Sequence, residues 1–110
     1  MKRKEYLNEQ ENLRLLDDCR NKDINKLKGS GYPAETDAHY LAKAKKCKEL
    51  LNEGHRFVTE AKFSNGLGRA DILDISESII YEIVCSEKEV SLVKKKAKYP
   101  LPFEIIRVIK

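Results

Sequence analysis

Residues 56–89 constrain the fold of this chain more than any other stretch of its sequence. They contain apolar segments at 57–63, 69–75 and 79–85, and side chains alternate along each segment with the period of two that is typical of β-strands. The connections at 64–68 (SNGLG) and 76–78 (SES) consist of residues that favour tight turns. The sequence therefore predicts consecutive strands joined by short loops, an arrangement that pairs antiparallel.

Each predicted strand carries an acidic residue among apolar neighbours, namely Glu60, Asp71 and Glu82. Because facing residues of antiparallel neighbours lie side by side, we expect Asp71 and Glu82 to meet on one face of the sheet. Two carboxylates at such a short distance repel each other unless they share a proton or bind a cation. Burial of Glu82 without a partner would cost several kcal/mol, which favours a functional role for this residue.

The alternation also predicts which side chains share a face. In the first strand Val58, Glu60 and Lys62 lie on one face, and in the second strand Asp71 shares a face with Leu73. We therefore expect Glu60 and Lys62 to project together from the sheet.

Helical patterns flank these strands. Residues 4–20 favour an amphipathic helix, residues 33–53 favour a second helix that ends at Gly54, and residues 86–98 favour a third, with Ser86 and Glu89 as a capping box. Residues 103–109 then predict a last strand, parallel to the preceding one because a helix connects them. The sequence thus predicts an α/β fold with a four-stranded mixed sheet, in which 1–32 form an N-terminal helix and linker and 33–110 form the core.

Composition sets broader limits. At 110 residues the chain has the size of one domain. A mean hydropathy of −0.59, without a long apolar run or a secretory signal pattern, predicts a cytoplasmic protein that makes no membrane contact. Cys19, Cys47 and Cys85 are widely spaced and predict reduced thiols. The net charge of +4 allows an anionic partner without requiring one.

The run Gly68-Arg69-Ala70-Asp71-Ile72, followed by Tyr81-Glu82-Ile83-Val84, resembles the signature of the PD-(D/E)xK nuclease superfamily. The element order α-β-β-β-α-β of residues 33–110 is similar to that of the same superfamily. The resemblance implies a three-layer restriction-endonuclease-like core that cuts DNA with Mg²⁺ or Mn²⁺, because the metal activates a water and offsets charge on the phosphate.

The resemblance also implies roles for individual residues. Asp71 and Glu82 match the metal-binding acids of the family, and Glu60 is the favoured third acid, ahead of Glu35 and Asp37. Contacts to nucleic acid are expected from Arg69 and from the lysines of the third predicted helix, Lys94, Lys95 and Lys96.

The sequence departs from the family at Val84, where a catalytic lysine is usual. Lys62 or Lys95 could supply the missing positive charge, and the sequence does not choose between them. A metal-dependent deoxyribonuclease is therefore the first functional hypothesis, and a nuclease-like domain that binds nucleic acid or a protein without cutting is the second. A structural or interaction protein that uses its first helix is the third. That helix also predicts a homodimer.

Simpler interpretations stand beside these. Asp71 could pair with Arg69 or Arg56, and Glu60 and Lys62 could form the solvent face of an edge strand. The lysines of the third predicted helix could be a solvated surface. His39 has no second ligand at a helical spacing, so it is expected at most to approach a phosphate.

Overall fold

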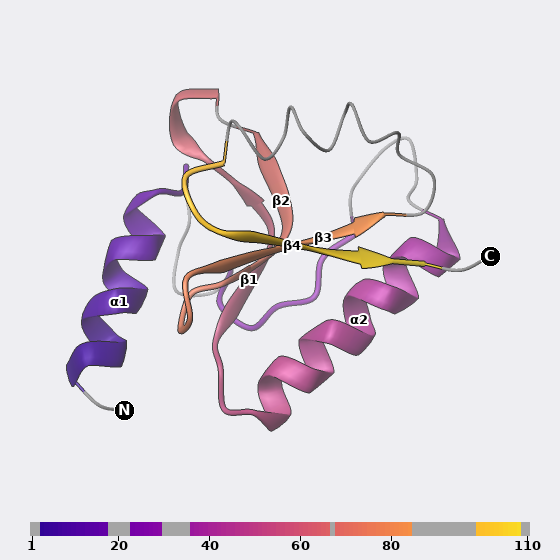
Figure 1. The fold of residues 1–110 in the computed structure, drawn as a ribbon, viewed down its shortest axis with the longest axis horizontal. Coiled ribbons are helices and arrows are strands. Elements are labelled where there is room, and N and C mark those ends of the chain that lie inside the picture. The colour runs from indigo at the N-terminus through magenta and orange to yellow at the C-terminus, as the bar shows by residue number, and fades with distance from the viewer. Residues whose placement is uncertain (1–2, 18–22, 30–35, 67, 85–98, 109–110) are drawn as a thin grey trace.

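The computed structural model describes residues 3–17, 23–29, 36–66, 68–84 and 99–108. These residues form an α/β fold with a four-stranded mixed sheet and two helices, as the sequence predicts (Figure 1). No helix in this part of the chain is both long enough and apolar enough to cross a membrane.

The sheet has the order β1-β2-β3-β4. Its strands are β1 (Phe57–Lys62), β2 (Arg69–Asp74), β3 (Ile79–Val84) and β4 (Phe103–Arg107). β1, β2 and β3 pair antiparallel, and β4 pairs parallel to β3, which confirms the predicted direction of the last strand. β1 and β4 therefore form the two edges of the sheet. The third predicted helix, 86–98, lies outside the described residues.

The helices α1 (Arg3–Arg14) and α2 (Asp37–Asn52) lie on different sides of the sheet (Figure 1). The Thr36 hydroxyl caps α2 by accepting a hydrogen bond from the His39 amide, and the helix stops before Gly54, whose φ of 78° favours glycine. α1 ends well before residue 20, where the sequence predicts its end. The chain pairs with the sheet instead, since the Asp17 amide donates to the Lys62 carbonyl at 2.8 Å.

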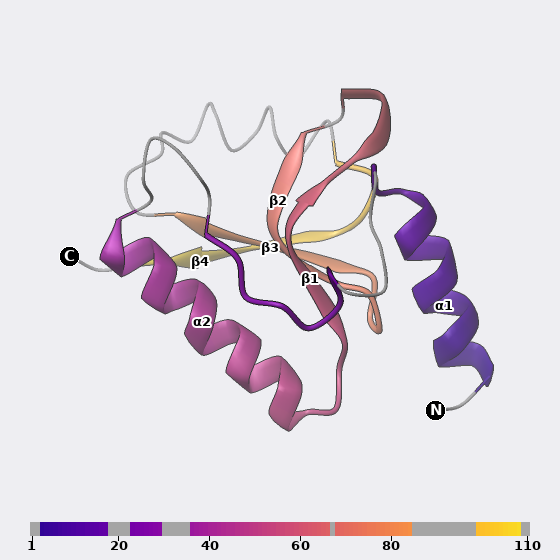
Figure 2. The same ribbon diagram turned by 180° about the vertical axis from the view of Figure 1, so that it is seen from behind.

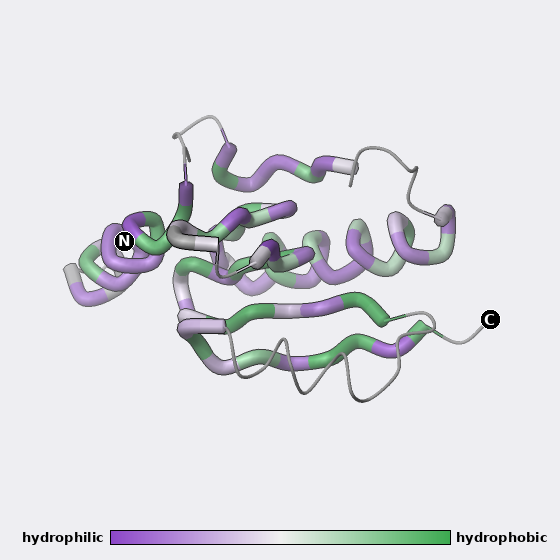
Figure 3. The backbone as a smooth tube through the Cα atoms, turned by 90° about the horizontal axis from the view of Figure 1, so that it is seen from above, coloured by the Kyte–Doolittle hydropathy of each residue, from purple (hydrophilic) through white to green (hydrophobic). Residues whose placement is uncertain are grey.

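Two buried clusters cover the two faces of the sheet. The α2-side cluster consists of Cys47, Leu50, Phe57, Ile72 and Tyr81. The α1-side cluster consists of Leu16, Val58, Ala61, Phe63, Ala70, Leu73, Ile75 and Ile80. Hydrophobic stretches of the strands are broken by single hydrophilic positions (Figure 3), and these positions include the candidate site residues.

The segment 23–29 runs beside β1 and extends the sheet at that end (Figure 2). The Asn25 amide donates to the Phe57 carbonyl at 2.7 Å, and the Asn25 side-chain oxygen accepts from the Phe57 amide. Thr59 anchors the same segment by accepting from the Lys28 amide. These bonds satisfy backbone groups that an open sheet edge would leave exposed.

The predicted alternation fails at Glu60 and at Asp71, so the expectations that Glu60 shares a face with Val58 and that Asp71 shares a face with Leu73 are wrong. Val58 and Leu73 pack in the α1-side cluster, whereas the side chains of Glu60 and Asp71 reach α2. Glu60 has a φ of 49°, in the left-handed region that non-glycine residues rarely adopt. This conformation breaks the strict reversal of side chains along β1 and turns the carboxylate toward the helix.

The turn between β2 and β3 is organised by Asp74, which is completely buried. Its Oδ1 accepts hydrogen bonds from the backbone amides of Ser76 and Glu77 at 3.0 and 3.1 Å. Its Oδ2 lies 2.9 Å from Nδ1 of His55. One carboxylate thus closes the turn and ties it to the end of α2.

α1 is held against the same turn by asparagine side chains. The Asn12 amide group donates to the Ile75 carbonyl at 2.8 Å and to the Ser78 hydroxyl at 2.9 Å, and Asn8 donates to the Ser76 carbonyl at 2.6 Å. The predicted first helix is therefore docked on the core through polar contacts.

Candidate functional site

Glu60 and Asp71, two of the three acids predicted to bind metal, are neighbours across β1 and β2. The pairs Thr59↔Ile72 and Ala61↔Ala70 flank them in the register, which places Glu60 opposite Asp71. Both carboxylates point toward α2. Each contacts a nitrogen-bearing side chain of that helix, and these two side chains lie one helical turn apart. The arrangement forms a polar layer between helix and sheet.

Lys43 supplies the cation beside Glu60. Its Nζ lies 3.7 Å from Oε2 of Glu60, and its side chain has no exposed surface. A lysine on a helix is usually exposed, but Lys43 is not. Lys43 belongs instead to the inward stripe that includes Cys47 and Leu50.

Burial dominates the surroundings of this charge pair. The Glu60 side chain is 9% exposed, and its Oε2 has no hydrogen-bond donor in the described part of the chain. Burial also raises the pKa of the neighbouring Cys47 thiol to about 11, although the charge of Lys43 lowers this pKa in part. Cys47 is therefore a neutral core residue, in agreement with its prediction as a reduced thiol. Cys19 and Cys85 lie outside the described residues.

Asp71 contacts both β3 and α2. Its Oδ2 accepts a hydrogen bond from the Ile83 amide at 2.7 Å, so the carboxylate lies beside the residue that follows Glu82 on β3. The same oxygen lies 3.3 Å from Nε2 of His39 on α2. The side chains of His39 and Asp71 are 19% and 15% exposed, so solvent reaches this pair.

Glu82 is 2% exposed and lies in the middle of β3. The Tyr99 hydroxyl donates a hydrogen bond to its Oε1 and also lies 2.8 Å from the Arg69 carbonyl oxygen. A carboxylate at this depth requires such a donor, because burial of a charge without one is costly.

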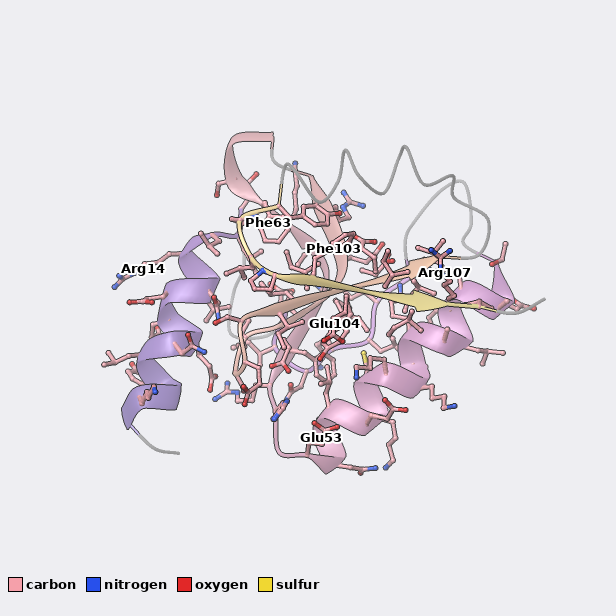
Figure 4. The ribbon with its side chains drawn as sticks, in the orientation of Figure 1. Arg14, Glu53, Phe63, Phe103, Glu104 and Arg107 are labelled. Carbon is pink, nitrogen blue, oxygen red and sulfur yellow. The ribbon has the colours of Figure 1, made fainter. Side chains whose placement is uncertain are left out.

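The Tyr99 ring is fixed by aromatic packing. Its centroid lies 5.5 Å from that of Phe63 and 5.4 Å from that of Phe103, and Figure 4 shows these two phenylalanines near one end of the sheet. A Cβ added to Gly68 would lie 3.2 Å from the Tyr99 ring, so glycine allows the ring to approach the loop before β2.

Each predicted metal-binding acid thus contacts another side chain: Glu60 contacts Lys43, Asp71 contacts His39, and Glu82 contacts Tyr99. Within the ranges that the structure describes, no three His, Cys, Asp or Glu side chains gather in a group that could hold a metal ion. The described residues therefore do not form a ready set of ligands for the predicted Mg²⁺ or Mn²⁺, whose binding stays a prediction.

The predicted cationic residues lie in several places. Lys62 is 62% exposed, and its Nζ lies 3.8 Å from Oδ2 of Asp17 rather than beside Glu60. Arg69 is exposed at the start of β2. Val84 is 3% exposed in β3, so the position that matches the lysine of the superfamily that the sequence resembles is part of the core. Lys94, Lys95, Lys96 and Glu35 lie outside the described residues.

Sequence reasoning missed the partners of the acids. Lys43 lies four residues after His39 and four before Cys47, a spacing that would have placed all of them on one helical face. Tyr99 offers no comparable signal, because its contact with Glu82 depends on how the chain returns after residue 98. Neither residue therefore entered the predicted site.

Comparisons of this chain with family models, with curated proteins and with solved structures found no match.

Proposed function

We propose that this chain is a nuclease-like domain that binds nucleic acid without cutting it. The observation that carries the proposal is the internal pairing of the acids: Glu60 with Lys43, Asp71 with His39, and Glu82 with Tyr99. In a metal-dependent nuclease these oxygens would be needed by the ion. Here side chains of the protein itself, a cation beside Glu60 and a hydroxyl donor to Glu82 among them, take the place of a bound cation in the proposal.

The restriction-endonuclease-like assignment is part of this proposal. It is supported by a helix before β1, by three antiparallel strands and by a fourth strand parallel to the third. It is also supported by Asp71 and Glu82 on adjacent central strands, as in the motif that the sequence resembles. Binding to nucleic acid is supported by the net charge of +4, which includes Arg69 and the lysines at 94–96.

Binding should be measured by fluorescence anisotropy with labelled duplex DNA, single-stranded DNA and RNA in the presence of EDTA. We expect the wild type to bind without metal, and substitution of Lys94, Lys95 and Lys96 by glutamine to weaken binding roughly tenfold for each lysine that touches a phosphate. Salt dependence should decrease in parallel, because fewer counterions are released. Lys26→Gln is the matched control, since Lys26 is exposed on the segment beside β1. If the wild type binds none of these probes, the proposed function is ruled out.

A metal-dependent nuclease is the second candidate function. It is favoured by the contact of Asp71 with the Ile83 amide, which brings its carboxylate next to the strand position of Glu82, and by the exposure of Asp71 and His39 to solvent. Asp71, Glu82 and Glu60 would then hold Mg²⁺ or Mn²⁺ after giving up their present partners. Cleavage of the same probes with either metal, abolished in Asp71→Asn, would establish this function in place of the first.

The proposed homodimer would use α1. Tyr6 and Leu7 on this helix are 53% and 51% exposed, which leaves apolar surface available for a second copy.

A further inference from the structure

A groove of about 290 Å³ lies between α2 and β4, and the paired acids are not among its described lining residues. Ala42, Ile106 and Val108 contribute its apolar part, and Lys45, Lys46, Glu49 and Arg107 contribute its polar part. Ile106 also packs against the α2-side cluster, so the walls belong to elements that are held together by the core. Figure 4 shows Arg107 on β4 near α2.

Positive charge predominates in this groove. Of the residues that line it, three are basic and one is acidic. Lys46 is already engaged, because its Nζ lies 4.3 Å from the Tyr81 ring centroid and 3.6 Å from Oε2 of Glu49. Lys45 and Arg107 are exposed, and no ion pair to either appears within the described ranges. The charge of these two side chains is therefore directed to solvent.

We propose that the groove between α2 and β4 binds the phosphate backbone of a nucleic acid, with Lys45 and Arg107 as the phosphate contacts. The inference rests on the proposed function and assigns phosphate contacts to residues other than Lys94, Lys95, Lys96 and Arg69. The guanidinium of Arg107 can donate two parallel hydrogen bonds to one phosphate, while Lys45 acts as a point charge. The side chains of Ile106 and Val108 offer apolar surface to the adjoining sugar.

The excess of basic side chains in the groove favours a polyanion as its occupant. A nucleic acid presents regularly spaced phosphates, so a few cations along a narrow surface suffice for each contact. A separate control with polyglutamate as a competitor tests for nonspecific association with acidic proteins.

The decisive experiment compares wild type with Lys45→Gln/Arg107→Gln by anisotropy, using labelled duplex DNA and labelled oligo(dT). We expect the double variant to bind roughly 10- to 100-fold more weakly at 0.1 M salt and to reduce the magnitude of the salt slope by about two. The control Lys4→Gln removes one positive charge from α1, the same change as each substitution in the groove, and should bind nearly as well as wild type. Because Lys45 and Arg107 are exposed, an unchanged melting temperature should accompany the weaker binding.

The outcomes separate this inference from the proposed function. Wild-type binding that the double variant retains in full would overturn the groove while leaving the proposed function in place. Absence of wild-type binding would overturn both. Displacement of DNA by polyglutamate at equal charge concentration, with the double variant binding polyglutamate as weakly as DNA, would identify an acidic protein as the occupant and contradict the assignment to nucleic acid.

Discussion

Replacement of Lys43 with methionine should lower the free energy of unfolding by about 3–5 kcal/mol, because it leaves the Glu60 carboxylate buried without its cation. Lys43 is completely buried and Glu60 is 9% exposed, so water cannot easily replace the missing partner. Methionine has similar length, which keeps the change in packing small. Urea denaturation followed by circular dichroism measures the effect.

The double variant Lys43→Met/Glu60→Gln tests the cause. Removal of both charges should restore most of the stability, since no buried charge is then left without its partner. Lys45→Met, on the exposed side of the same helix, should change the free energy of unfolding by no more than about 0.5 kcal/mol. Equal, small effects of Lys43→Met and Lys45→Met would show that Lys43 is not buried against Glu60 in solution.

Replacement of Asp74 with alanine should destabilise the protein by about 3 kcal/mol, because two turn amides and His55 lose their acceptor in a buried site. Asp74→Asn should cost less, since the asparagine oxygen can still accept from the Ser76 and Glu77 amides. Thermal unfolding monitored for both variants measures the difference.

Glu77→Ala provides the matched control for Asp74, because Glu77 belongs to the same turn but its side chain is 56% exposed. Its effect on the free energy of unfolding should stay within about 0.5 kcal/mol. If Asp74→Ala proved as mild as Glu77→Ala, the carboxylate would not be the element that closes the turn.

Most of the sheet could be predicted from the sequence. The period of two and the turn residues at 64–68 and 76–78 locate β1, β2 and β3 to within a residue at each end. The helix predicted between β3 and β4 favours their parallel pairing, because parallel neighbours need a long crossover connection. Both features depend on local pattern, which a single sequence carries.

The polar layer could not be predicted in the same way. The positive φ of Glu60 has no signature in residue type, since such angles usually belong to glycine or asparagine. The charge of Lys43 argues for exposure, and only the partner from β1 makes its burial acceptable. The contact of Tyr99 with Glu82 joins residues far apart in sequence. These features are set by tertiary contacts.

We propose that Glu60, Asp71 and Glu82 are held by partners within the protein and do not require a cation. The most direct measurement is the melting temperature of the wild type in EDTA and in millimolar Mg²⁺ or Mn²⁺. A metal that binds the native state preferentially raises the melting temperature. We predict that the melting temperature of the wild type is the same in all three conditions. The melting temperature of Asp71→Asn should likewise not change when metal is added. A rise with metal in the wild type that is absent in Asp71→Asn would contradict the claim.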